Sequence, residues 1–209
     1  MIFKICGLKD KNSVICCEEN KVNYFGMIFY ESSPRNISID QAKVLTELSK
    51  KLSIKPVGVF VNHNIYELKK IISILDLRYI QLHGDENQSY IDEIKKEFNL
   101  KIIKKISIKI SNDLNKINHL KNIDYLLFDY KPEQNELPGG NSKTFEWSLL
   151  KGKKIQIPWF ISGGINESNI KNIQEFLNPN GIDLSSGVEE SPGIKNNNMI
   201  SSLFKKYNA

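Results

Sequence analysis

The chain has 209 residues, of which 40% are hydrophobic and 25% charged, and this composition excludes collagenous, mucin-like and disordered proteins. The length predicts a single domain over residues 1–209 that can bury a core without disulfides or metals. The 29 Lys and Arg against 24 Asp and Glu leave a net charge of +5, far from the dense basic stripe of a nucleic-acid-binding protein.

Short apolar or β-branched runs alternate along the chain with longer segments of helical period. The runs predict eight strands, at residues 2–6, 24–29, 56–61, 79–83, 101–106, 125–129, 159–162 and 182–185. The segments between and after them predict helices, at residues 13–20, 40–51, 65–75, 89–98, 112–120, 145–151, 166–177 and 198–207. This alternation favours parallel strands joined by right-handed crossovers.

Eight strand–helix units leave roughly 26 residues for each unit, which suits a (β/α)8 TIM barrel at the small end of its size range. We therefore predict the α/β class, with one parallel eight-stranded barrel surrounded by outer helices. The main alternative is a doubly wound open sheet. Its usual glycine-rich dinucleotide-binding turn is absent, because Cys6-Gly7-Leu8-Lys9 after the first strand holds a single glycine.

Targeting and cysteine patterns indicate the compartment. The sequence shows no signal-peptide pattern and no apolar run of about 18 to 20 residues that would span a bilayer. Cys6, Cys16 and Cys17 are an odd number and the last two are adjacent, so no disulfide framework is expected and the last two are predicted to be packing residues. The three histidines are scattered, which argues against a metal site. We expect a cytoplasmic protein with no membrane or nucleic-acid partner.

Polar residues collect at the C-terminal ends of four predicted strands. Because side chains alternate along a strand, Cys6, His83, Asp129 and Asp183 converge at one mouth of the barrel if their shared face is the lumen. The C-terminal mouth is where such barrels carry their active sites. Taken singly, the cysteine could be a packing residue and the other three could be capping or loop-ordering residues. Their coincidence at four strand ends favours a functional site.

Two glycine-rich turns follow the last two predicted strands. The first contains Gly163 and Gly164, and the second contains Ser185, Ser186 and Gly187. Paired turns at these positions of a barrel commonly bind phosphate through backbone N–H groups, because glycine lets the backbone approach an anion closely. The alternative is two ordinary strand-to-helix turns. We predict that these five residues hold a phosphate group.

The longest connection, residues 130–144, follows the sixth predicted strand and contains Gly139 and Gly140. Loops of this length in compact domains are often lids or binding loops, and a Gly-Gly pair can act as a hinge. The loop lacks the Gly-x4-Gly-Lys-Ser/Thr spacing of a P-loop, so ATP binding is not supported.

Motifs spread in order over the whole chain resemble the phosphoribosylanthranilate isomerase family of tryptophan biosynthesis. They lie at residues 4–8 (KICGL), 33–35 (SPR), 81–86 (QLHGDE), 126–129 (LLFD), 139–147 (GGNSKTFEW), 162–166 (SGGIN) and 183–193 (DLSSGVEESPG). Three positions depart from the pattern. Ser142 stands where the family commonly has Gly, Glu146 where it has Asp, and the loop after Leu8 lacks the usual Thr.

The resemblance implies an enzyme that converts N-(5'-phosphoribosyl)anthranilate into 1-(2-carboxyphenylamino)-1-deoxyribulose 5-phosphate by an Amadori rearrangement. It implies Asp129 as the general acid that opens the sugar ring and Cys6 as the general base that removes the C2' proton. Three residues are expected to bind the substrate: Arg35 would face the anthranilate carboxylate, Asp183 would bind polar groups, and His83 would lie at the mouth, with its particular role open. The enzyme would act on this small molecule as a monomer or homodimer, without a cofactor or metal.

The implied acid and base make opposite demands on their surroundings. Asp129 must be protonated, which requires a pKa raised by burial or by a carboxylate such as Asp183. Cys6 must be a thiolate, which requires a nearby cation, and Lys4 on the same strand face is the candidate. Two alternatives stay open. One is the histidine-pathway aminoaldose isomerase, which has an aspartate where this chain has Cys6, and the other is a non-catalytic barrel that senses a sugar phosphate.

Overall fold

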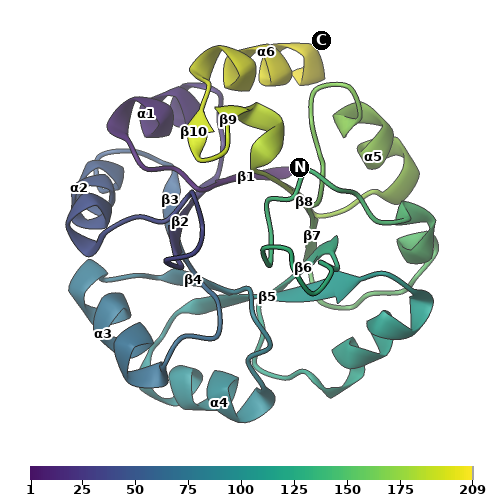
Figure 1. The fold of residues 1–209 in the computed structure, drawn as a ribbon, viewed down its shortest axis with the longest axis horizontal. Coiled ribbons are helices and arrows are strands. Elements are labelled where there is room, and N and C mark those ends of the chain that lie inside the picture. The colour runs from purple at the N-terminus through teal and green to yellow at the C-terminus, as the bar shows by residue number, and fades with distance from the viewer. Residues whose placement is uncertain (209) are drawn as a thin grey trace.

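The computed structural model describes residues 1–208 and shows a closed barrel of parallel strands inside a ring of helices (Figure 1). Strands pair in chain order, and β8 pairs with β1 to close the barrel. The barrel strands are β1 (Ile2–Cys6), β2 (Tyr24–Phe29), β3 (Lys55–Phe60), β4 (Tyr79–Leu82), β5 (Lys101–Ile108), β6 (Tyr125–Tyr130), β7 (Trp159–Ile161) and β8 (Gly181–Leu184). The predicted α/β class and (β/α)8 TIM barrel are confirmed.

The helices lie outside the barrel, and several begin at side-chain caps. The α-helices are α1 (Lys11–Glu19), α2 (Ile39–Ser49), α3 (Ile65–Leu75), α4 (Gln88–Glu97), α5 (Ile170–Leu177) and α6 (Asn197–Asn208). Short 3₁₀ helices cover Ser111–His119, Trp147–Leu150 and Ser186–Val188. Ser38, for example, caps α2 by accepting a hydrogen bond from the Gln41 N–H, and Gln41 accepts one from Ser38 in return.

The helix predicted at 145–151 is only a 3₁₀ helix over Trp147–Leu150, and two further predicted helices differ from the structure for a local chemical reason. The helix predicted at 166–177 begins only at Ile170, because the Asn166 and Asn169 side-chain amides donate to the Gly164 carbonyl and hold the chain in a turn. The helix predicted at 112–120 is a 3₁₀ helix. Its start is fixed by the Asp113 carboxylate, which accepts hydrogen bonds from two preceding backbone N–H groups.

A hairpin that the sequence pattern did not predict follows β8. It consists of β9 (Glu189–Ser191) and β10 (Ile194–Lys195), which pair antiparallel around a turn with Gly193 at φ 87°. A Cβ atom at Gly193 would lie 2.3 Å from the Pro34 carbonyl oxygen, so the tip of the hairpin packs closely against the loop after β2. This contact brings Glu189 and Lys195 to the mouth of the barrel.

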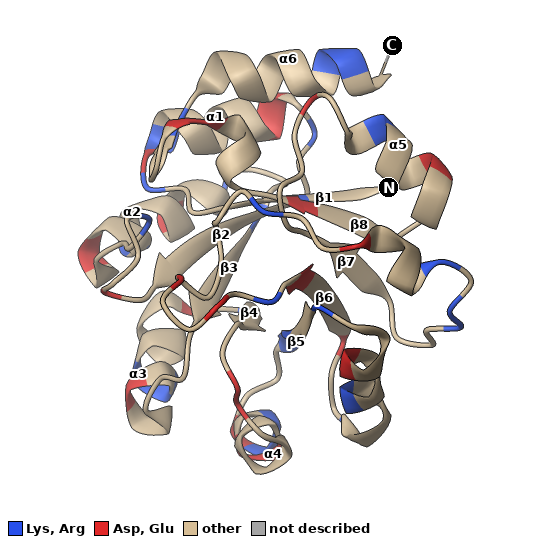
Figure 2. Ribbon diagram, turned by 45° about the vertical axis from the view of Figure 1, so that its right-hand side comes forward, with Lys and Arg blue, Asp and Glu red and all other residues tan. Residues whose placement is uncertain are grey.

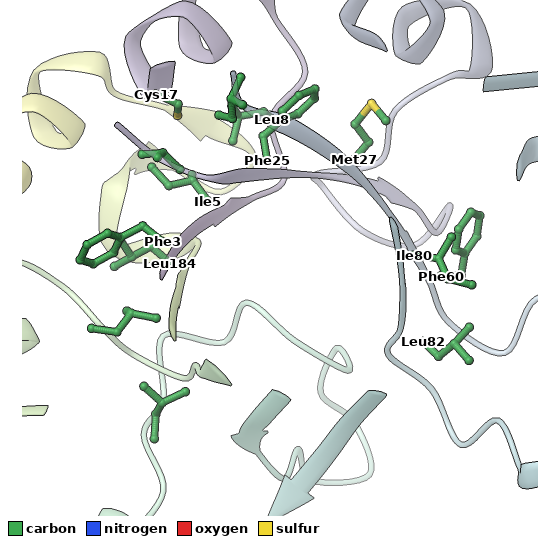
Figure 3. Packing of buried hydrophobic residues seen from close by; sticks show 14 of the residues in the cluster. Phe3, Ile5, Leu8, Cys17, Phe25, Met27, Phe60, Ile80, Leu82 and Leu184 are labelled. Atoms are coloured by element: carbon green, nitrogen blue, oxygen red, sulfur yellow. The ribbon is translucent and has the colours of Figure 1, made fainter. Parts of the chain in front are cut away.

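Alternation along each strand divides the core into two layers. The outer layer packs between strands and helices, and Figure 3 shows part of it, with Phe3, Ile5, Phe25 and Leu184 among its members. Phe3 also contacts α6, with its ring centroid 4.9 Å from that of Phe204. The inner layer fills the lumen with the side chains of Cys6, Tyr24, Val57, Val59, Ile103, Leu127 and Phe160.

Charged residues of both signs occupy the outer helices, as α3 and α4 show in Figure 2. Cys6, Cys16 and Cys17 are buried free thiols, and the two on α1 pack in the outer layer as expected. Among residues 1–208, none of the helices has the length and apolar character needed to cross a bilayer.

Candidate active site

A pocket opens at the C-terminal mouth of the barrel. Its lining includes nine of the ten predicted site residues: Cys6, Arg35, His83, Asp129, Gly163, Gly164, Asp183, Ser185 and Ser186. The tenth, Gly187, lies outside the lining. A Cβ atom there would lie 2.0 Å from the Ile165 carbonyl oxygen. Close backbone packing therefore accounts for the glycine at 187, and the structure gives it no contact with the pocket.

Lys4 and Asp183 form a buried ion pair deep in the lumen. The Lys4 Nζ atom donates to both carboxylate oxygens of Asp183, at 3.0 and 2.9 Å, and the side chain of Lys4 is 0% exposed. Burial acts to lower the pKa of Lys4, but Asp183 and Cys6 together outweigh it and the pKa of Lys4 is raised. Lys4 is therefore a permanent cation beneath the pocket.

Cys6 lies one strand repeat above Lys4, next to Gly26 of β2. A Cβ atom at Gly26 would lie 2.8 Å from the Cys6 Sγ atom and 3.3 Å from the Lys4 Nζ atom, so glycine leaves room for both groups. Burial raises the pKa of the Cys6 thiol, and the charge of Lys4 opposes this increase without overcoming it. Contrary to the requirement for a thiolate, the resting form of Cys6 at neutral pH is the thiol, because burial, together with the Asp183 carboxylate, outweighs the positive charges of Lys4 and Lys195.

Asp129 is the last inward-facing residue of β6. Its Oδ1 atom accepts a hydrogen bond from the Tyr130 N–H at 2.8 Å, and its Oδ2 atom lies 3.6 Å from His83 Nε2. Burial raises the pKa of Asp129 to about 6, while the nearby Lys105 ammonium opposes the increase. The carboxyl thus meets the demand on a general acid mainly through burial, and Asp183 contributes less.

His83 is a neutral ring held between two partners. Burial and the positive charges of Lys105 and Lys4 hold the pKa of His83 well below its usual range. The Pro138 carbonyl, 3.1 Å from Nε2, can only accept, so Nε2 carries the hydrogen and Nδ1 accepts from the Gln81 amide at 2.8 Å. The ring therefore joins β4 to the loop after β6.

Arg35 reaches the pocket from the loop after β2, and one edge of its guanidinium is already occupied. Nε and Nη2 donate to the two carboxylate oxygens of Glu189 at 2.9 and 2.7 Å, and Nη2 also donates to the Gly140 carbonyl at 3.3 Å. Glu189 accepts a further bond from Lys195 at 2.7 Å. The group predicted to face a carboxylate is thus held in place by a buried carboxylate of the hairpin.

The two glycine-rich turns contact the groups around them. Gly163 and Gly164 have φ values of 89° and 62°, a region that favours glycine, and a Cβ atom at Gly163 would lie 3.1 Å from the Asp129 carboxylate. Ser185 donates to the Cys6 carbonyl at 3.1 Å, and Lys195 donates to the Ser185 carbonyl at 3.0 Å. The second turn is therefore tied both to β1 and to the hairpin.

Four buried residues at this site were not assigned a role from the sequence: Gln81, Lys105, Glu189 and Lys195. Lys105 faces the lumen two positions after Ile103 and donates to the Pro138 carbonyl at 3.2 Å, so alternation along β5 would have found it. Glu189 and Lys195 lie on a hairpin that no pattern predicted. Across residues 1–208, no group of three or more His, Cys, Asp or Glu side chains is placed to hold a metal ion.

A closed (β/α)8 barrel with a thiol, a carboxyl of raised pKa and several buried charges at its C-terminal mouth defines a barrel enzyme that works by acid–base chemistry. The chain matches the family model described as N-(5'phosphoribosyl)anthranilate (PRA) isomerase over residues 3–206, and it belongs to this family. The resemblance seen in the motifs is confirmed, and the match decides against the two alternatives.

Curated relatives and solved structures agree with the family. An N-(5'-phosphoribosyl)anthranilate isomerase from a Thermoanaerobacter species is 40% identical over 97% of this chain and 96% of its own length. One from Paramagnetospirillum magneticum is 35% identical over 97% and 94%. The crystal structure of the Thermotoga maritima phosphoribosyl anthranilate isomerase has a TM-score of 0.86 at 28% identity, covering 100% of this chain and 99% of that one. The protein is accordingly an isomerase.

Proposed function

We propose that this pocket rearranges N-(5'-phosphoribosyl)anthranilate in tryptophan biosynthesis, with Asp129 as general acid and Cys6 as general base. The observation that carries the proposal is their placement. They stand at the ends of β6 and β1, line one pocket and are both buried. A related solved structure, 25% identical with a TM-score of 0.80, is a complex with reduced 1-(o-carboxyphenylamino)-1-deoxyribulose 5-phosphate.

The reaction needs one proton donor and one proton acceptor. The Asp129 carboxyl gives its proton to the ribose ring oxygen, the C1'–O bond breaks, and the anilino nitrogen lone pair forms the C1'=N bond of a protonated Schiff base. The Cys6 thiolate takes the C2' proton, and the electrons of that C–H bond form the C1'=C2' bond of an enolamine. Tautomerisation of the enolamine to the ketone gives the product, with no net gain or loss of protons or electrons.

The remaining predicted residues bind the substrate in this proposal. The Arg35 guanidinium, on the side away from Glu189, takes the anthranilate carboxylate. The turns around Gly164 and Ser186 take the 5'-phosphate, and Asp183 takes a polar group of the sugar. The neutral imidazole of His83 lines the mouth of the pocket, and its hydrogen bond to the Pro138 carbonyl links the end of β4 to the loop after β6.

The proposal also covers the domain organisation, compartment, cofactor need and oligomeric state of the enzyme. We take the chain to be a single-domain cytoplasmic enzyme that needs no cofactor and binds no nucleic acid. It works as a monomer or a homodimer. One related Thermotoga maritima structure is of monomers generated from a dimeric phosphoribosylanthranilate isomerase, at 28% identity.

The proposal is tested by following the loss of phosphoribosylanthranilate fluorescence with purified wild-type protein and with Asp129→Asn and Cys6→Ser. Removing a general acid or base reduces the rate by about 100-fold or more, so both variants should fall at least this far below wild type. A wild-type protein that leaves the signal unchanged would reject the reaction. Variants as active as wild type would reject the assignment of acid and base.

A further inference from the structure

Gln81 is a buried glutamine on the luminal face of β4. Its side chain is 0% exposed and lines the pocket two residues below His83. In the strand register its neighbours are Val59 of β3 and Ile103 of β5, which are both members of the luminal layer. Apolar neighbours on both sides cannot satisfy an amide, and a polar residue in this position therefore needs a reason.

Only one end of the Gln81 amide has a partner. Nε2 lies 2.8 Å from His83 Nδ1, whereas Oε1 is buried and has no hydrogen-bond partner among residues 1–208. Turning the amide by 180° would set Oε1 against the unprotonated His83 Nδ1, so that two acceptors would face each other, and it would leave Nε2 unpaired. An unpaired buried amide oxygen costs about 1–3 kcal/mol, and a fold seldom retains one without a compensating contact. The nearest space that can supply this contact is the pocket itself.

We infer that Gln81 Oε1 accepts a hydrogen bond from a sugar hydroxyl of the bound substrate, which makes Gln81 a substrate-binding residue at the floor of the site. The inference rests on the proposed function. The ionised phosphate and carboxylate of the substrate offer only acceptors, so they cannot satisfy this oxygen. The anilino N–H is the other donor of the substrate, and binding of an anthranilate probe tests it. The Lys4 ammonium and the Asp183 carboxylate beside the floor are already paired with each other.

The hydrogen bond from the Gln81 amide to His83 also fixes the tautomer of the imidazole. By donating to His83 Nδ1 it fixes the hydrogen of the ring on Nε2, which points to the Pro138 carbonyl of the loop over the pocket. Gln81 thus joins the floor, the ring at the mouth and the loop in one chain of hydrogen bonds. A ligand hydroxyl on Oε1 completes this chain.

The test compares the binding of three probes by wild type and by Gln81→Met, which keeps the length of the side chain and removes its polar atoms. The probes are ribulose 5-phosphate, which carries sugar hydroxyls, anthranilate, which carries an amine and a carboxylate, and inorganic phosphate. Gln81→Met should weaken binding of ribulose 5-phosphate by about 10- to 100-fold, as expected for a lost buried hydrogen bond. Binding of anthranilate and inorganic phosphate should stay within about twofold of wild type.

Controls separate a lost contact from a damaged fold. Gln156→Met changes an exposed glutamine in the same way and should alter none of the three affinities. Gln81→Glu keeps an acceptor but loses the donor to His83, and it should bind ribulose 5-phosphate more tightly than Gln81→Met does. It also serves as the test if Gln81→Met does not fold.

Two results would overturn the inference. One is a folded Gln81→Met that binds ribulose 5-phosphate as wild type does, and the other is a Gln81→Met that loses all three probes equally. A wild-type protein that does not turn over phosphoribosylanthranilate would instead reject the proposed function. The turnover assay of wild type therefore tests the proposed function, and the binding of ribulose 5-phosphate by Gln81→Met tests the inference separately.

Discussion

Burial acts on Asp129 and Cys6 in the same direction, and the chemistry needs it in only one of them. Taking either group out of water disfavours the charged form, so the pKa values of both are raised. This suits Asp129, which must be protonated to act as an acid. It works against Cys6, which must lose its proton, and the Lys4 ammonium below it offsets only part of the effect.

The rate should therefore depend on pH in a defined way. Between the pKa of Asp129, about 6, and the higher pKa of Cys6, the loss of protonated Asp129 and the gain of thiolate cancel, so kcat/KM should be level. Below about pH 6 Asp129 is fully protonated while the thiolate continues to decline, and kcat/KM should fall about tenfold per pH unit. Steady-state kinetics across pH 4.5 to 8 test this, and a rate that keeps rising down to pH 5 would contradict it.

Asp129 should also lower the free energy of unfolding at neutral pH. Its pKa is raised from 3.8 to about 6 in the folded protein, so the folded state binds more protons than the unfolded state between these values, and stability falls as the pH rises through them. Asp129→Asn should therefore be more stable than wild type at pH 7, by at most about 3 kcal/mol, and about equally stable near pH 3, below both pKa values. Urea unfolding at the two pH values measures this. A stability difference that does not change with pH would count against the raised pKa.

Lys4 should control the ionisation of Cys6. Replacing Lys4 with Met removes the nearest cation, so the pKa of Cys6 should rise further and its alkylation by iodoacetamide should need a higher pH. Mass spectrometry of the Cys6 peptide measures the reaction, and Lys11→Met, at an exposed lysine of α1, is the control. Because Lys4→Met leaves Asp183 unpaired, the double variant with Asp183→Asn is measured beside it. An unchanged pH dependence in both would show that Lys4 does not act on Cys6.

At the scale of elements, the hairpin of β9 and β10 is part of the site. Arg35 and Lys195 lower the pKa of Glu189 although burial acts in the opposite direction, so Glu189 is a buried anion that holds the Arg35 guanidinium in a fixed orientation. The hairpin thus positions a residue that comes from the loop after β2.

Glu189→Gln should loosen Arg35 without touching the acid or the base. We expect KM for phosphoribosylanthranilate to rise about tenfold, the equivalent of 1.4 kcal/mol, with kcat within about threefold of wild type. Glu190→Gln, at the exposed neighbouring position, should change neither constant. A fall in kcat with KM unchanged would show that Glu189 serves the chemical step and not the binding of substrate.

The elements show where sequence patterns succeed and fail. All eight barrel strands were predicted because each is a short apolar run between turn residues. The hairpin was not, because Glu189-Glu190-Ser191 is charged, short and held by its contact with the loop after β2. Likewise, the inward positions of Cys6 and Asp129 follow from alternation, whereas the pairing of Arg35 with Glu189 depends on tertiary contact and leaves no local pattern. The missing partner of Gln81 Oε1 is visible only in the packed lumen.

At the scale of the whole molecule, closure of the barrel depends on its two ends. β8 pairs with β1, and α6 at the end of the chain packs on Phe3 of β1 through Phe204, which is 2% exposed. The N- and C-terminal elements therefore hold the ring closed, and the site lies across this junction, since Cys6 and Asp183 come from β1 and β8.

Phe204→Ala should weaken this closure. Removing a fully buried phenylalanine costs about 3–5 kcal/mol, so the free energy of unfolding should fall by this amount. Urea denaturation measures the change, and Phe176→Ala, at a 40% exposed phenylalanine of α5, is the matched control with a much smaller effect. A loss below 1 kcal/mol for Phe204→Ala would mean that α6 is not needed to close the barrel.

The central claim is that Cys6 and Asp129 act on one sugar from two sides. It is tested most directly by a crystal structure of this protein with reduced 1-(o-carboxyphenylamino)-1-deoxyribulose 5-phosphate. We predict the C2' atom within about 3.5 Å of the Cys6 Sγ atom, with the Asp129 carboxyl on the opposite side of the sugar. A ligand whose C2' atom lies away from Cys6, with the sugar outside the space between β1 and β6, would contradict the account.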